Sequence, residues 1–110
     1  MLKKTNTYDT ERGIIMNEKI MQAHRTLMES ISLAEDIARL YLEDDGLYND
    51  LMYFHDKVIA NNITEYELVT VMLIGEELRE ADASVANCLD IDCLELIGLL
   101  REAKGSRKVG

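Results

Sequence analysis

The sequence predicts a small all-α protein, a four-helix and mostly antiparallel bundle preceded by a polar N-terminal arm. Three observations support this prediction. The chain has no proline and 47% apolar residues, rich in Leu, Ile, Met and Ala, a composition that favours helices over the short, turn-punctuated strands of a sandwich or barrel. Apolar residues recur every three to four positions, the period of one helix face. Capping patterns and glycine or asparagine separate the periodic segments.

The length of 110 residues suits a single domain with one apolar core, without metal or disulfide support. We divide the chain into an N-terminal arm over residues 1–15, a helical bundle domain over 16–105 and a basic C-terminal tail over 106–110. The arm is polar, mixed in charge and without helical period. The bundle domain therefore carries all the expected packing.

The first helix is expected from about Asn17 to Leu42. A seam of residues at alternating spacings of four and three is typical of a helix that lies along a neighbour. A second apolar side runs through Leu33, Ile37 and Leu40. Packing against one neighbouring helix of the same chain would cover only one of these two sides. A homodimer through the first helix is therefore an open alternative. The seam consists of Ile20, His24, Leu27, Ile31, Ala34, Ala38 and Tyr41.

The second helix is expected over about residues 47–60. Before it, Gly46 can adopt the left-handed conformation at the end of the first helix, and Asp44 or Asp45 can cap the second. After it, Asn61 and Asn62 predict a stop, because Asn tolerates the left-handed region.

The third helix is expected to begin at Thr64. Thr64 and Glu67 have the spacing of a capping box, and Ile63 with Leu68 adds the pattern of a hydrophobic staple. Little of the first three turns is polar. An apolar stripe this wide predicts that the third helix lies in the middle of the bundle and is the most buried.

Two alternatives describe the end of the third helix: it continues to about Asn87, or it breaks near Asp82. Asp92 and Glu95 repeat the capping-box spacing. We therefore expect a fourth helix from Asp92 to about Ala103.

Glycines and the apolar pattern together predict the packing. A glycine inside a helix costs about 1 kcal/mol relative to alanine, so Gly75 and Gly98 indicate close helix crossings. The expected core is Leu27, Ile31, Ala34, Ala38, Leu51, Phe54, Val58, Leu68, Val71, Met72, Leu78, Leu96 and Leu100.

The sequence predicts no catalytic site, no cofactor and no metal centre. It contains no Gly-rich phosphate loop, no Gly-x-Ser-x-Gly elbow and no His-Glu-x-x-His motif. His24 and His55 lie within apolar stripes, so each is expected at the edge of the core with one hydrogen-bonded nitrogen. The spacing of Cys88 and Cys93 fits neither a zinc nor a redox motif, and both are expected as small buried thiols.

The location expected from the sequence is the cytoplasm. No run of 18 or more apolar residues is present, and the start of the chain lacks an apolar secretory core. We therefore expect no contact with a membrane.

The charge is the strongest functional signal. The net charge is −9, and residues 13–100 hold 18 acidic against 5 basic residues, so the body should repel nucleic acid. Two acidic clusters form a candidate surface for a basic partner, although a solvated surface that keeps the protein soluble explains them equally simply. The candidate partner-binding residues are Glu43, Asp44, Asp45, Asp50, Glu76, Glu77, Glu80 and Asp82.

Size, charge and helicity lead to a functional hypothesis by analogy. We expect a non-enzymatic acidic interaction module that binds and restrains a basic protein partner, as an inhibitor, immunity protein or antitoxin does. A homo-oligomeric helical assembly or scaffold protein is the alternative. A third and weaker hypothesis is a ligand-binding bundle with a pocket formed by Tyr41, Tyr48, Met52 and His55.

Overall fold

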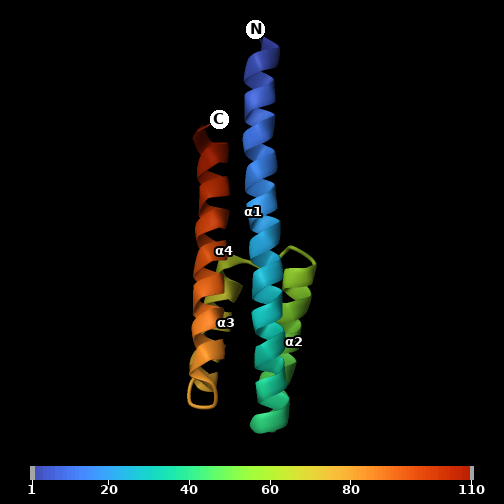
Figure 1. Ribbon diagram of the computed structural model, residues 1–110, viewed down its shortest axis with the longest axis vertical. Helices are drawn as coiled ribbons and strands as arrows, with labels where there is room; N and C mark the ends of the chain where they lie inside the picture. The colour runs from blue at the N-terminus through green and yellow to red at the C-terminus, as the bar shows by residue number, and fades with distance from the viewer. Residues whose placement is uncertain (1, 110) are drawn as a thin grey trace.

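The computed structural model describes the backbone of residues 2–109 and the side chains of residues 17–105. This part of the chain contains four α-helices and no strand (Figure 1), which confirms the predicted all-α bundle. The helices are α1 (Leu2–Asp36), α2 (Asp45–Ile59), α3 (Glu65–Leu78) and α4 (Ala83–Val109), and a π-helical turn, η1 (Ile37–Tyr41), extends α1.

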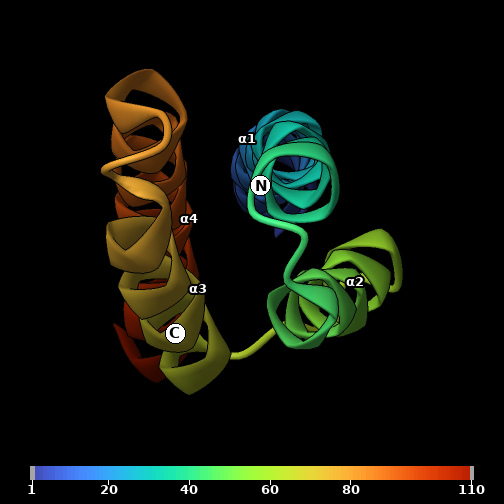
Figure 2. The ribbon, with the colours of Figure 1, turned by 90° about the horizontal axis from the view of Figure 1, so that it is seen from below.

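Successive helices run in opposite directions, so the bundle is antiparallel (Figure 1). Seen along its axis, α3 and α4 form one layer and α1 and α2 form the other (Figure 2). α1 packs against both α2 and α4, and α3 packs against α4 and only slightly against α2. The long helices α1 and α4 extend past α2 and α3, giving a molecule of 61 × 20 × 18 Å.

The predicted division into arm, bundle and tail stays a prediction. α1 begins at Leu2, so its backbone helix runs through the expected boundary at residues 15 and 16 without a break. The side chains of the arm and of the tail over residues 106–110 lie outside the described residues.

The start of α3 follows the sequence pattern. The Thr64 hydroxyl accepts a hydrogen bond from the Glu67 backbone N–H at 3.2 Å, and the Glu67 carboxylate accepts one from the Thr64 backbone N–H at 2.9 Å. These two bonds satisfy amide groups that a helix start otherwise leaves without partners. The capping box is therefore confirmed. Ile63 and Leu68 are both buried, as the hydrophobic staple predicts.

The expectation that α3 lies in the middle of the bundle is wrong. α3 occupies an edge and has one extensive neighbour, α4. Val71 is fully buried, but Val69 and Leu73 are exposed. The pattern of apolar residues measures the width of the apolar stripe, whereas the number of neighbours depends on how the other helices are arranged.

The third helix breaks near Asp82, as one of the two alternatives predicted. The Asp82 carboxylate accepts a hydrogen bond from the Val85 backbone N–H at 3.2 Å and so caps α4. The expected helix start at Asp92 is therefore wrong. Asp92 lies within α4, is buried, and accepts a hydrogen bond from the Ser30 hydroxyl of α1.

The two remaining turns agree with the sequence in part. Asp44 caps α2 through a 3.0 Å hydrogen bond from the Leu47 backbone N–H, and Asn61 ends α2 with a φ of 56°. Gly46, expected in the left-handed conformation, instead lies inside α2. Glu43 takes that conformation, with a φ of 50°.

The predicted core is largely correct. Met72 and Leu100 are half-buried against the core cluster, and the other eleven predicted residues are within it. Gly75 marks a close crossing, because a Cβ atom there would lie 3.4 Å from Leu89 Cδ1 of α4. The same expectation is wrong for Gly98, which is exposed and would have no heavy atom within 4 Å of an added Cβ.

Candidate functional site

The two acidic clusters of the sequence lie at the same end of the molecule. The α1–α2 turn and the α3–α4 turn are both at the bottom of Figure 1 and face the viewer in Figure 2. This follows from the alternating directions of the four helices. We call this surface the acidic end. It consists of the eight predicted residues, namely Glu43, Asp44, Asp45, Asp50, Glu76, Glu77, Glu80 and Asp82, of which Asp82 is half-buried and the rest are exposed.

The carboxylates of the acidic end fall into two groups. Asp44 and Asp82 cap α2 and α4, and Glu76 is bound by Arg79. The other five make no hydrogen bond or ion pair with any side chain in the described range 17–105, which leaves their charges accessible to a partner. These five are Glu43, Asp45, Asp50, Glu77 and Glu80.

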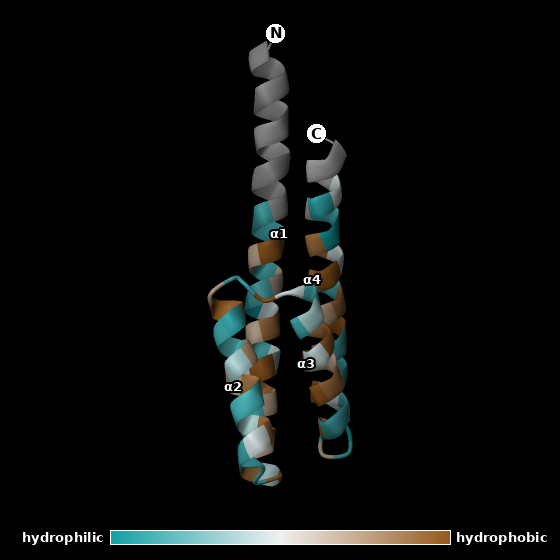
Figure 3. Cartoon of the chain, turned by 180° about the vertical axis from the view of Figure 1, so that it is seen from behind, coloured by the Kyte–Doolittle hydropathy of each residue, from teal (hydrophilic) through white to brown (hydrophobic). Residues whose placement is uncertain are grey.

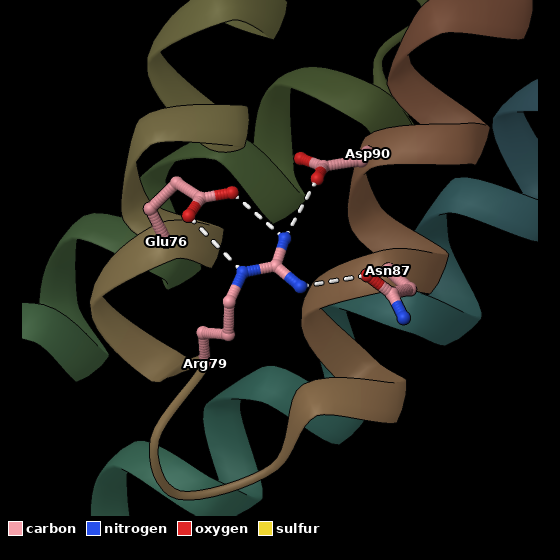
Figure 4. A network of polar contacts seen from close by, with 4 residues as sticks. All are labelled: Glu76, Arg79, Asn87 and Asp90. Carbon is pink, nitrogen blue, oxygen red and sulfur yellow. Dashed lines mark hydrogen bonds and ion pairs between the residues drawn. The ribbon is translucent and has the colours of Figure 1, made fainter.

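Arg79 holds the α3–α4 turn in place (Figure 4). Its guanidinium binds both oxygens of Glu76, with an Nη2–Oε1 distance of 2.7 Å and an Nε–Oε2 distance of 3.1 Å. It also donates to Asn87 Oδ1 at 2.7 Å and to Asp90 Oδ2 at 3.0 Å, both on α4. A planar, bidentate pair of this kind is geometrically specific. Arg79 therefore fixes one side of the acidic end and neutralises part of its charge.

Replacing Arg79 by Gln is expected to raise the pKa of Glu76. The hydrogen bond and charge of Arg79 hold the pKa of Glu76 below its usual value of 4.5. Because the folded-state pKa is lowered, the pair stabilises the fold above the unfolded-state pKa, and this contribution is lost as the pH falls through the lowered value. The effect on stability is small, since Glu76 is exposed and Arg79 is only half-buried.

Titration of the side-chain carboxyl carbons by NMR measures this change. Glu65 is the internal control, because Arg101 lowers its pKa at the other end of α3. In the Arg79→Gln variant, Glu76 should return toward 4.5 while Glu65 keeps its lowered pKa. A Glu76 pKa that does not move would contradict the assignment.

Apolar side chains accompany the charges at the acidic end. Leu40, Tyr41 and Leu42 lie directly before the acidic turn, and all three are exposed, Tyr41 to 81%. Tyrosine is enriched at the centre of protein–protein contacts, and charged groups are typical of the surrounding rim. The sequence pattern places Leu40 and Tyr41 on packing sides of the first helix, so it does not predict their exposure.

The four residues of the hypothetical ligand pocket do not line the hollow found in the described part of the chain. Tyr41 and Met52 are exposed, and the Nδ1 atom of His55 lies 2.7 Å from Oε1 of Glu35. Tyr48 is half-buried, with the guanidinium of Arg39 5.6 Å from its ring centre. An open hollow of roughly 180 Å³ lies elsewhere, between α1 and the end of α2. It is lined by Met21, His24, Arg25, Met28, Val58, Ile59 and Asn61.

Both histidines have the predicted role. His24 is buried, and its Nδ1 lies 2.7 Å from the Ile20 carbonyl oxygen of the same helix. His55 is half-buried, and its Nδ1 lies 2.7 Å from Glu35 Oε1 on α1. Each ring has one hydrogen-bonded nitrogen at the edge of the core, as expected.

The two cysteines differ in environment. Cys93 is buried, and burial, followed by the charges of Asp92 and Asp90, raises its pKa to about 12. This thiol is therefore protonated and unreactive at neutral pH. Cys88 is exposed, so the expectation of two buried thiols is wrong for this residue.

Within the described part of the chain, no three His, Cys, Asp or Glu side chains are grouped so that they could hold a metal ion. None of the helices searched there combines the length and apolar character needed to cross a bilayer. Comparison of the chain with family models, curated proteins and solved structures finds no match. The acidic end is therefore the candidate site, on the basis of its own geometry.

Proposed function

We propose that the protein is a non-enzymatic interaction module whose acidic end binds and restrains a basic protein partner. The observation that carries this proposal is topological: two acidic clusters far apart in the sequence share one end of the bundle. Five of their carboxylates have no partner among the described side chains, and three exposed apolar residues lie beside them.

Charge and apolar surface supply different parts of the binding. The carboxylates attract a basic partner over a distance and orient it before contact. Tyr41 and its leucine neighbours then exclude water and supply contact area. A partner that uses its basic surface to bind another polyanion would be blocked while this surface is covered. The inhibitory character of the proposal rests on this competition.

The location that we propose is the cytoplasm. Cys88 is exposed and Cys93 is buried five residues away on the same helix. In a reducing compartment both side chains remain thiols. This agrees with the structure, in which the two cysteines are not bridged.

The test compares three baits in a capture experiment from the organism that encodes the chain. The first is the wild-type protein. The second neutralises accessible charges of the acidic end and leaves the two caps and the Glu76–Arg79 pair intact. Its substitutions are Glu43→Gln, Asp45→Asn, Glu77→Gln and Glu80→Gln. The third is a matched control that loses the same amount of charge elsewhere on the surface, with the substitutions Glu18→Gln, Asp56→Asn, Glu95→Gln and Glu102→Gln.

A basic protein should be retained by the wild type and by the control and lost from the acidic-end variant. With the purified partner, affinity should fall as salt rises, because exposed charges are screened. Retention of the same proteins by all three baits would contradict the proposal, as would binding that does not depend on salt.

A homo-oligomer held together by the first helix is less well supported. That alternative rested on the two apolar sides of the helix. In the structure α1 has two neighbours in its own chain, α2 and α4, and they bury Ile37 but leave Leu33 and Leu40 of the second side exposed.

A further inference from the structure

The layer formed by α3 and α4 carries apolar residues on the side away from the core. Val69 and Leu73 of α3 and Ile91 and Leu94 of α4 are between 46% and 64% exposed. Figure 3 shows long hydrophobic stretches on both helices. We call the surface of these four residues the outer face.

Each residue of the outer face points away from the core. Val69 and Leu73 lie two positions either side of Val71, which is fully buried. Ile91 follows Leu89 by two positions, and Leu94 precedes Leu96 by two, and both of these leucines are fully buried. Two positions correspond to about 200° around a helix. The four side chains therefore project from the side opposite the packed one.

The register of the two helices brings these residues to the same level. Gly75 meets Leu89, Arg79 binds Asn87, and Glu65 binds Arg101. Because the helices are antiparallel, residue numbers rise on one as they fall on the other, and Leu73 lies level with the stretch from Ile91 to Leu94. The outer face is thus gathered at one level of the α3–α4 layer.

We propose that the outer face binds the same face of a second copy of this chain, in an antiparallel, two-fold dimer. The dimer shares Glu76 and Glu80 with the acidic end, and Leu73→Glu separates the two proposals because it changes the outer face and leaves every carboxylate of the acidic end in place. α3 has one extensive neighbour, α4, which covers only part of its apolar surface. A second copy would cover the rest. Exposed apolar residues gathered on one side of a helical layer typically mark an interaction site.

The charges that flank the outer face identify a second copy as the occupant. Glu80 follows Leu73 toward the α3–α4 turn, and Lys104 follows Leu94 toward the opposite end of α4. Glu76 and Arg101 lie at the same two flanks but are paired within the chain, with Arg79 and Glu65. A two-fold axis through the patch places the acidic flank of one copy against the basic flank of the other, at two equivalent contacts. A parallel arrangement would place like charges together.

The overall charge of −9 does not forbid this contact. At physiological ionic strength the Debye length is about 8 Å, so charges on the distant parts of two copies are largely screened. The charges that flank the apolar patch are close enough to act. An apolar centre with a charged rim is the usual anatomy of such an interface.

Sedimentation equilibrium of the purified chain tests the proposal. From about 1 to 500 µM, a range that covers weak dimers, the mass should rise from 12.5 kDa toward twice that value. Leu73→Glu and Leu94→Glu should remain monomeric over this range with an unchanged far-UV CD spectrum, because both sites are exposed. Leu33→Glu is the matched control on α1, where the leucine is 52% exposed, and this variant should still dimerise.

A charge swap tests the antiparallel arrangement. Glu80→Lys alone and Lys104→Glu alone should each weaken the dimer roughly three- to tenfold, since each change affects two symmetric contacts. The double variant should regain wild-type affinity. Wild-type protein that stays at 12.5 kDa throughout overturns the dimer. Dissociation by Leu33→Glu instead of Leu73→Glu overturns the assigned face, and a double variant as weak as the single ones overturns the antiparallel arrangement.

Discussion

Replacing Val71 by Asp is expected to unfold the bundle. Val71 is fully buried in the core cluster. An aspartate there is either charged and unpaired or protonated at a large cost in free energy. Substitutions of this kind cost more than about 4 kcal/mol, and the total stability of a domain is only about 5 to 15 kcal/mol. Thermal unfolding followed by far-UV circular dichroism should show a lost or strongly lowered transition.

Val69→Asp is the matched control for this prediction. It makes the same chemical change two residues away on the same helix, at an exposed site. Measured at submicromolar concentration, where the monomer is observed, it should change the free energy of unfolding by less than about 1 kcal/mol. Equal melting of the two variants would show that the burial assignment is wrong. Leu68→Asp should behave like Val71→Asp, because Leu68 is also fully buried.

The second large effect is expected at the contact between Ser30 and Asp92. The Ser30 hydroxyl of α1 donates a hydrogen bond to the Asp92 carboxylate of α4, and both residues are buried. Ser30→Ala removes the donor and leaves a buried carboxylate without a partner. We expect a loss of about 1.5 to 3 kcal/mol, the range for hydrogen bonds to charged groups. Urea unfolding of the variant measures this loss.

A double variant separates the hydrogen bond from general packing. Adding Asp92→Leu to Ser30→Ala removes the unpaired carboxylate as well, and most of the lost stability should return. Thr26→Ala is the control on the same helix, because its hydroxyl bonds only to the Gln22 carbonyl at 3.0 Å. It should cost less than about 0.5 kcal/mol. A double variant that is less stable than Ser30→Ala alone would contradict this account.

The success of the sequence patterns depended on how local they are. The capping box at Thr64 and Glu67 involves residues three apart, so its meaning is set within one helical turn, and it formed as predicted. Asp92 and Glu95 have the same spacing, but Asp92 bonds to Ser30, 62 residues away. Only the packing of α1 against α4 decides that Asp92 stays inside a helix. No local pattern holds that information.

Burial of α3 shows a second limit of the same kind. Period and polarity identified Leu68, Val71 and Leu78 as core residues, because each faces the side that any packing arrangement must cover. The same reasoning failed for the position of the helix. Whether Val69 and Leu73 are covered depends on how many neighbours α3 has, and this is a property of the whole bundle.

The acidic residues of the candidate site could be predicted from the sequence, but the exposed apolar residues beside them could not. Charge counting selected the acidic residues, and the expected antiparallel bundle already implied that its first and third turns share an end. The exposure of Leu40 and Tyr41 could not be predicted, because an apolar residue at helical spacing is normally packed. The structure shows that no helix covers these residues where α1 and η1 end.

The placement of the chain ends has a practical consequence. α1 begins and α4 finishes at the opposite end of the molecule from the acidic carboxylates (Figure 1). An affinity tag, a bead or a fused protein attached at either terminus would therefore lie far from the acidic end and leave it exposed to solvent.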